Sequence, residues 1–371
     1  MKLEMLSLKQ FRNYENQKIE FGNGINILYG DNAQGKTNVI EAIHLTGTGK
    51  SHRSKHLGDM VRHGEDRFSI DACVRNKERD NHVHLTYDRK TGKKMTINDV
   101  SSAKWSSLLG MMHVLLFSPE TMDIVKGGPG ERRRFMDILL CQLDARYLRA
   151  LQQYTSILRN KTASLRDHNG LDKYRDMIPI WNEGMAHAGA IIALRRMQAA
   201  ERLQQLANHE LSVLSGGRET MTVSLQTFTG KEVMKDYDAL RSLLMEKLSR
   251  AANREEASGM CLVGIHRDEI HMAINDNAVR TFASQGQQRS IALSLILASM
   301  NLYWEESGAM PILLLDDVMS ELDPHRQEYL LGTLEKTQTF ITTTDRSEFM
   351  NRFQGETVYL EVRDGIVLRN E

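Results

Sequence analysis

The stretch that decides the fold is Gly30-Asp31-Asn32-Ala33-Gln34-Gly35-Lys36-Thr37. It matches the pattern G-x-x-x-x-G-K-[ST], in which glycines let backbone N–H groups curl around phosphate oxygens. The apolar run 25–29 before it predicts a buried strand, and the residues from Lys36 to about Thr46 predict a helix that adds a positive dipole end. Because the pattern requires this strand–loop–helix context, we predict a nucleotide site in an α/β domain.

All eight residues of this loop are therefore candidate nucleotide contacts. Lys36 is expected to reach the β- and γ-phosphates, and the hydroxyl of Thr37 is expected to ligate Mg²⁺. A second Gly-Lys-Ser, at 49–51, does not complete the pattern, because His44 stands where the first glycine belongs.

An apolar run at 312–315 predicts a buried parallel strand that ends in Asp316 and Asp317. The C-terminal ends of such strands open onto the ligand crevice. Asp316 is the candidate for holding Mg²⁺ through water, and Asp317 is the candidate for orienting or deprotonating the attacking water. The alternative is a buried strand followed by a polar turn, in which the two acids have no role at a site. The presence of the phosphate loop favours the magnesium and water roles over this alternative.

The hexamer Ser284-Gln285-Gly286-Gln287-Gln288-Arg289 stands immediately before a predicted helix that runs from Gln287 to Trp304. A helix N-terminus with a glycine for close approach and a free serine hydroxyl can bind an anion. The sequence therefore predicts a second anion site, distinct from the first. Taken alone, the hexamer fits a polar helix cap better than an anion site.

Composition narrows the class of protein. With 371 residues, 41% hydrophobic and 26% charged, the chain is globular and long enough for two domains. Three widely spaced cysteines form neither a disulfide framework nor a metal-binding pattern, which favours a reduced, cytoplasmic setting. No stretch approaches the roughly 18 apolar residues that a membrane span needs.

The middle of the chain, residues 118–258, is predicted to be mostly helical, unlike the segments on either side of it. Helical periodicity predicts one helix from Glu131 to about Asp167, a second from Pro179 to Leu214 and a third from about Asp236 to Ala257. We therefore expect a helical lobe over residues 118–258, inserted into an α/β domain made of residues 1–117 and 259–371.

The neutral total of 48 basic and 48 acidic residues hides a segregation. Residues 1–258 carry 39 Lys and Arg against 31 Asp and Glu, whereas residues 259–371 carry 9 against 17. The densest basic segment, Lys126 to Arg166, holds nine cations against three acids, which predicts DNA binding through the backbone without sequence readout. The alternative is that Arg132–Arg134 only solvate or cap a helix.

Further short motifs accompany the loop, the acidic strand end and the hexamer. They are Phe11–Tyr14, Gly49–Arg53, Phe117–Glu120, Lys126–Gly127, Arg132–Phe135, Gly264–Asp268 and Ser320–Asp323. In this order the motifs resemble the ATP-binding-cassette ATPase superfamily, and within it the RecF family of bacterial recombination-repair ATPases, over nearly the whole chain.

The resemblance implies an ATPase that works as a homodimer with ATP and Mg²⁺. Ser284, Gly286 and Gln287 would then contact the nucleotide bound to the partner copy, and Arg12 would approach the nucleotide in its own copy. It further implies a recombination mediator that binds duplex and single-stranded DNA at gaps, hydrolyses ATP slowly and aids RecA loading through RecR and RecO.

Three features depart from the pattern of that superfamily. There is no obvious glutamine loop near Ser118-Pro119-Glu120. Asp317 stands where most members have Glu, and its shorter side chain is consistent with slow turnover. The switch histidine is absent, which leaves Thr343 or Thr344 as candidate sensors of the γ-phosphate. An alternative function is a P-loop kinase that phosphorylates a small molecule as a monomer; the hexamer and the helical lobe argue against it.

Overall fold

The computed structural model describes residues 1–75, 80–102, 105–166, 171–230, 234–350, 352–353 and 355–370. The chain divides into two compact units: a first unit of residues 1–122 and 292–371, and a second unit of residues 123–291. The return to the first unit comes 33 residues later than the expected boundary at 259. The reason is strand pairing, because β10 (Glu269–Ile274) pairs with β9 (Met221–Gln226) of the second unit.

The first unit contains a six-stranded sheet in the order β15-β14-β3-β13-β12-β8. Its strands are β3 (Ile25–Tyr29), β8 (Val114–Phe117), β12 (Ile312–Leu315), β13 (Thr339–Thr343), β14 (Thr357–Arg363) and β15 (Ile366–Asn370). All neighbours are parallel except β14 and β15. The loop after β3 and the carboxylates after β12 therefore emerge at the same edge of the sheet, with only β13 between them.

A second, antiparallel sheet of the first unit has the order β2-β1-β4-β5-β6-β7. It comprises β1 (Lys2–Phe11), β2 (Tyr14–Glu20), β4 (Arg67–Arg75), β5 (Asp80–Asp88), β6 (Gly92–Ile97) and β7 (Val100–Ser101). Alternate side chains of β4 are buried, so one face of this sheet joins the core that also packs α1 (Lys36–Thr48), while the other face is polar.

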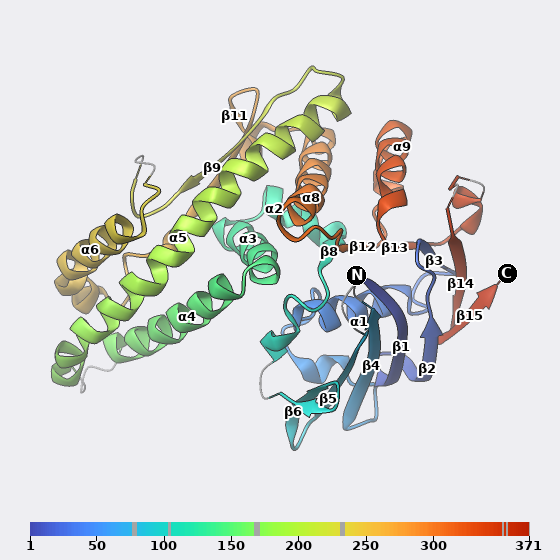
Figure 1. Cartoon of the computed structure of the whole chain (residues 1–371), viewed down its shortest axis with the longest axis horizontal. Coiled ribbons are helices and arrows are strands. Elements are labelled where there is room, and N and C mark those ends of the chain that lie inside the picture. The colour runs from blue at the N-terminus through green and yellow to red at the C-terminus, as the bar shows by residue number, and fades with distance from the viewer. Residues whose placement is uncertain are drawn as a thin grey trace. The chain divides into compact units, whose positions relative to one another are not determined.

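The second unit is mostly helical. It contains α2 (Asp123–Lys126), α3 (Pro129–Leu143), α4 (Ala145–Arg166), α5 (Leu171–Ser215), α6 (Tyr237–Ser258), β11 (Asn277–Ala278) and α7 (Val279–Phe282). Helices α4, α5 and α6 lie side by side (Figure 1), and β9, β10 and β11 form a small antiparallel sheet. Helix α8 (Gln285–Ser307) begins in this unit and continues in the first.

The remaining helices are short. They are η1 (Leu57–Met60), η2 (Trp105–Leu108), η3 (Pro119–Met122), η5 (Ile265–Arg267), η6 (Met319–Glu321), α9 (Pro324–Thr333), η7 (Leu334–Lys336) and η8 (Arg346–Phe349). Within the described ranges, no helix has the length and apolar character needed to cross a membrane.

Two predicted helices were wrong in their extent. The helix expected from Glu131 to Asp167 is divided at Asp144, whose Oδ1 accepts hydrogen bonds from the N–H groups of Arg146 (2.7 Å) and Tyr147 (3.1 Å). A side chain that satisfies the free N–H groups of a new helix favours a fresh start over continuation. Pro179 lies inside α5 rather than at its start; it is exposed, so water can satisfy the carbonyl that the proline leaves free. The third helix is confirmed as α6.

Candidate nucleotide site

The loop between β3 and α1 has a backbone that its glycines make possible. Gly30 and Gly35 have φ angles of 143° and 122°. A Cβ on Gly30 would lie 2.3 Å from the carbonyl oxygen of Val362, and one on Gly35 would lie 2.7 Å from Nδ2 of Asn13. Both glycines are therefore required by close packing as well as by backbone conformation.

Lys36 is folded back against this loop. Its Nζ donates hydrogen bonds to the carbonyl oxygens of Gly30 (2.6 Å) and Asp31 (2.7 Å). Burial lowers the Lys36 pKa, and the nearby carboxylates of Asp317 and Asp31 oppose that shift. The N–H groups of Lys36 and Thr37, the first two residues of α1, make no hydrogen bond to the described residues, whereas the N–H of Asn38 donates to the carbonyl of Gly35 at 2.9 Å. The loop thus combines an ammonium group and free N–H donors at a helix N-terminus, which is a site for phosphate oxygens.

Asp316 joins the end of β12 to the start of α1. Its Oδ1 accepts hydrogen bonds from the hydroxyl groups of Thr37 (3.0 Å) and Thr342 (2.9 Å). Burial raises the Asp316 pKa, although both hydrogen bonds act to lower it. The structure therefore brings together the two residues that the sequence nominated for Mg²⁺.

The oxygens of Thr37 and Asp316 fit a magnesium ion. Mg²⁺ prefers oxygen ligands and usually takes one or two from the protein and the rest from water and phosphate. In keeping with that, the parts of the chain that the structure describes contain no cluster of three or more His, Cys, Asp or Glu side chains able to hold a metal by themselves.

Asp317 has a left-handed backbone, with φ of 54°, and an exposed side chain. Its N–H donates to Oγ1 of Thr342 at 2.9 Å, so one threonine on β13 holds both acidic residues. Sequence reasoning missed Thr342 and suggested Thr343 or Thr344 as a sensor. The hydroxyl of Thr343 is engaged by the carbonyl of Asp345 (3.2 Å). The position of β13 between β3 and β12 is the signal that could have indicated Thr342.

A hairpin residue also supports the loop. Nδ2 of Asn13 donates to the carbonyl of Gln34 at 2.7 Å, and Nδ2 of Asn38 donates to Oδ1 of Asn13 at 2.8 Å. The Gln34 side chain in turn accepts the N–H of Asp364 at 2.6 Å. Asn13 and Asp364 had no local signature of this role, because the contacts join segments far apart in the sequence.

Arg12 lies beside α1, held by a buried carboxylate. Its Nε and Nη2 donate to Glu41 at 2.8 and 2.7 Å, and its Nη1 donates to the carbonyl of Asp59. Burial alone would raise the Glu41 pKa, but hydrogen bonds from Arg12 and Ser51 outweigh it and hold the Glu41 pKa below its ordinary value. A contact of Arg12 with nucleotide stays a prediction.

Ser284 and Gln287 belong to the second unit, at the start of α8. The Ser284 N–H donates to Oε1 of Gln287 (2.9 Å), and the Gln287 N–H donates to Oγ of Ser284 (3.2 Å). This reciprocal pair is a capping box, so the polar-cap interpretation of the hexamer is correct locally. Ser284 is exposed, and its O–H remains able to donate, which leaves the predicted contact of Ser284, Gly286 and Gln287 with a nucleotide open.

The basic segment Lys126–Arg166 is less available than its composition indicates. Arg132 pairs with Glu269, Arg133 donates to the carbonyl of Asp268 at 2.6 Å, and Lys161 is buried against Glu255. Exposed cations remain on α4: Arg146, Arg149, Arg159 and Arg166, of which the last three share an arc of about 100° at 100° per residue.

The family described as "RecF/RecN/SMC N terminal domain" matches residues 2–366. A "DNA replication and repair protein RecF" from Ruminiclostridium cellulolyticum is 36% identical over 366 residues, covering 98% of each chain. One from Symbiobacterium thermophilum is 37% identical, covering 100% of this chain and 99% of the other. This chain belongs to the RecF family.

Solved structures agree with that assignment. The RecF structure titled "recombination mediator protein RecF-ATP in RecFOR pathway" has a TM-score of 0.91 and 33% identity, covering 100% of this chain and 97% of that one. An Smc head bound to part of ScpA has a TM-score of 0.59 at 14% identity and shows a shared fold only. The expected ATP-binding-cassette type of fold and the resemblance to the RecF family are both confirmed.

Proposed function

We propose that this chain is an ATP-dependent, DNA-binding recombination mediator of the RecF type. ATP pairs two copies, the pair binds duplex and single-stranded DNA at gaps and junctions without sequence preference, and slow, DNA-stimulated hydrolysis releases it. The observation that carries this proposal is the buried Asp316 carboxylate 3.0 Å from the Thr37 hydroxyl, beside the phosphate loop. The solved RecF structure whose title names ATP supports the same nucleotide here.

The chain's own residues divide the work at this site. The loop N–H groups and Lys36 bind the phosphates, for which Lys36 exchanges its carbonyl partners. Thr37 and Asp316 would hold Mg²⁺, which supplies positive charge against the phosphates when bound. Asp317 orients the attacking water and accepts its proton, because its carboxylate is exposed and its backbone is fixed by Thr342.

Ser284 and Gly286 act on the nucleotide of the partner copy. The exposed Ser284 hydroxyl and the N–H groups of Gln285 and Gly286, which make no hydrogen bond to the described residues, form a donor set for phosphate oxygens at the start of α8. Each nucleotide would then be held by both copies, so hydrolysis requires the dimer.

DNA contacts and partners complete the proposal. The arginines on one side of α4 meet phosphates of the DNA backbone, which predicts steep salt dependence. RecR binds this chain and, with RecO, connects it to RecA loading in the cytoplasm. The RecFOR pathway named in the titles of the solved relatives supports this set of partners.

Sedimentation tests the central step. The chain is centrifuged with ADP, ATP or a slowly hydrolysed ATP analogue, each with and without gapped DNA. Dimers in ATP or the analogue, and monomers in ADP, are expected. A chain that turns over ATP as a monomer under all these conditions would contradict the proposal.

The variant Ser284→Arg distinguishes ATP binding from ATP-driven dimerisation and hydrolysis. It is expected to abolish ATP-driven dimerisation and DNA-stimulated hydrolysis while ATP binding is retained, because Ser284 lies outside the unit that holds the loop. Ser249→Arg, at an exposed position of α6, is the matched control and should dimerise normally.

A further inference from the structure

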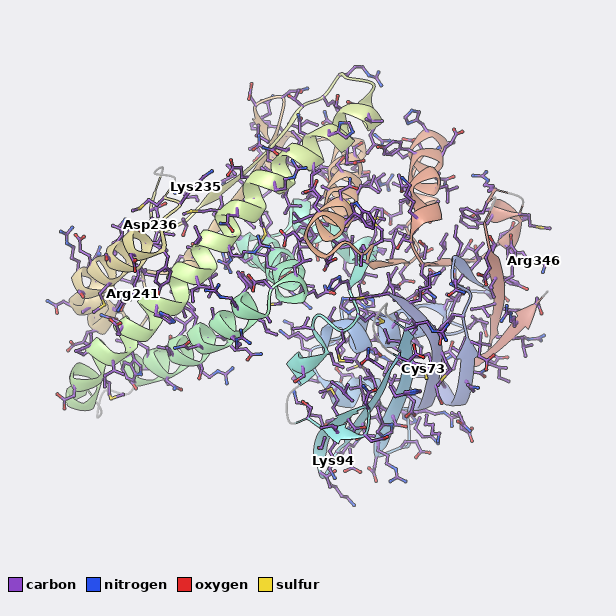
Figure 2. The ribbon with its side chains drawn as sticks, in the orientation of Figure 1. Cys73, Lys94, Lys235, Asp236, Arg241 and Arg346 are labelled. Atoms are coloured by element: carbon purple, nitrogen blue, oxygen red, sulfur yellow. The ribbon has the colours of Figure 1, made fainter. Side chains whose placement is uncertain are left out.

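The polar face of the antiparallel sheet is hollowed. A cavity of about 670 Å³ lies on strands β1, β2, β4, β5 and β6 of the first unit. The residues that carry the argument form one cross-strand row, because each is the register partner of the next: Asn16, Lys9, Ser69, Thr86 and Lys94. All five line the hollow, and Figure 2 labels Lys94 on β6.

Two cations of this hollow, Lys9 and Lys94, are free to bind a ligand. Lys9 and Lys94 are exposed, and neither ammonium group makes a hydrogen bond or ion pair with the residues that the structure describes. Arg67, also exposed, lines the same hollow. Three strand spacings of about 4.8 Å separate Lys9 from Lys94, so the backbones at these two residues stand roughly 14 Å apart.

The acids of the hollow are already compensated. Glu15 pairs with Arg62 at 3.0 Å. The backbone N–H groups of Thr91 and Lys90 donate to Asp88 and hold its pKa below the ordinary value, so Asp88 stays charged, and its cross-strand partner Arg67 supplies the opposite charge. The remaining titratable group, His84, is bonded to Asp71 on the same face. The uncompensated charge of the hollow is therefore positive.

Between the two lysines lie the hydroxyl groups of Ser69 and Thr86, and beside Lys9 lies the amide of Asn16. Lysine, hydroxyl and amide groups are the usual donors to DNA phosphates. Tyr87 follows Thr86 on the opposite face of the sheet, where it pairs with the core residue Phe68 and packs against that core, so the row itself carries no aromatic ring for stacking bases. Single strands are bound largely by such stacking, so these donors favour the backbone of a duplex.

We propose that this hollow is a phosphate-contact surface for duplex DNA, with Lys9 and Lys94 as its principal contacts. The proposal rests on the DNA binding put forward under Proposed function, and it adds a surface on the first unit to the α4 arginines of the second. Because it uses no base-reading group, it contributes affinity without sequence preference.

The test is binding of the full chain, with a slowly hydrolysed ATP analogue, to a fluorescent duplex over a series of salt concentrations. K9Q/K94Q is expected to bind about five- to twentyfold more weakly near 0.1 M salt. The slope of log affinity against log salt should fall by about 2, since each phosphate contact contributes about 0.9. K9R/K94R should restore both quantities.

K336Q/R369Q is the matched control, because it removes two exposed cations of the first unit outside the hollow. ATP binding by every variant verifies folding. If the wild-type chain binds duplex and K9Q/K94Q loses no more affinity or slope than this control, the hollow is not a DNA surface while the proposed function stands. If the wild-type chain binds no duplex at all, both proposals fail.

Discussion

In the second unit, Lys161 on α4 and Glu255 on α6 form an ion pair of 2.7 Å in which neither side chain is exposed. In the first unit, Glu41 on α1 is equally buried, but 20% of its partner Arg12 remains exposed. The sealed pair is completed from within the unit, since Lys161 also donates to Asn182 on α5. The pair of Glu41 and Arg12 instead lies next to the phosphate loop. Asn13, the residue after Arg12, donates a hydrogen bond to the carbonyl of Gln34 in that loop.

This difference distinguishes a buried ion pair that stabilises the packing of helices from one that lies at the nucleotide site. A buried charge whose partners all come from packed helices fixes how those helices meet, whereas a buried charge with an exposed partner can respond to a ligand. The same contrast applies to Asp316, which is buried but bonded to the loop residue Thr37. The three predictions below test the contrast, from the largest expected effect to the smallest.

Lys161→Met should lower the free energy of unfolding of the second unit by about 3–5 kcal/mol, because it leaves Glu255 buried without a countercharge. Hydrogen exchange of the α4–α6 amides measures the loss, since a chain of two units need not unfold in one step.

Two variants control that experiment. Arg250→Met breaks the exposed pair with Glu246 and should cost less than about 1 kcal/mol. Lys161→Met combined with Glu255→Leu should recover much of the loss. A cost for Lys161→Met as small as that for Arg250→Met would mean that the sealed pair does not hold the helices.

Asp317→Asn should slow hydrolysis about 10²–10³-fold, which corresponds to about 2.7–4 kcal/mol, because the amide cannot accept the proton of water. ATP binding should persist, since the loop and Asp316 are intact, and the ATP-bound dimer should therefore accumulate. Steady-state turnover and nucleotide binding are measured on the same preparation. Equal losses of both would place Asp317 in binding rather than in chemistry.

Glu41→Gln should lower the stability of the first unit by about 1–2 kcal/mol at neutral pH, through loss of charge-assisted hydrogen bonds to Arg12. The folded-state pKa of Glu41 lies below the ordinary value of 4.5. The contribution of its charge is therefore fully present above about pH 4.5 and disappears as the pH falls through the folded-state pKa.

Denaturant unfolding of the wild type and of Glu41→Gln, followed from pH 7 to pH 3, should show two stability curves that converge toward acid. A difference between the curves that is constant over this range would show that the charge of Glu41 contributes nothing. Glu20→Gln, at an exposed surface pair with Lys18, serves as the control and should follow the wild type closely.

Much of the site was predictable because its determinants are local. The glycines of 30–37 require particular backbone angles, and the apolar run 312–315 before Asp316 and Asp317 predicted a buried strand with two carboxylates at its end. The capping box at Ser284 is likewise contained in four residues. The predicted helix from Glu131 to Asp167 was wrong because two local signals compete there. Helical periodicity favours continuation, but the Asp144 side chain caps a new helix.

The remaining contacts were beyond sequence reasoning. Thr342 reaches Asp316 because strand order places β13 between β3 and β12, and Asn13 reaches Gln34 because the β1–β2 hairpin turns against the loop. Charge showed the same limit: the second unit holds 24 basic and 20 acidic residues and the first unit holds 24 and 28, an imbalance of four in each, whereas the division of the sequence at residue 258 gave an imbalance of eight.

The sequence alone therefore determined the nucleotide loop, the acidic strand end and the family, since backbone conformation and short-range order encode them within a few residues. Only the tertiary structure decided which hydroxyl holds Asp316, which acid holds Arg12, and that Lys9 and Lys94 stand in one cross-strand row. Those pairings depend on strand order and register. Register pairs Lys9 with Ser69, for example, although they are 60 positions apart in the sequence. No local pattern carries that information, because it arises only when distant strands share a core.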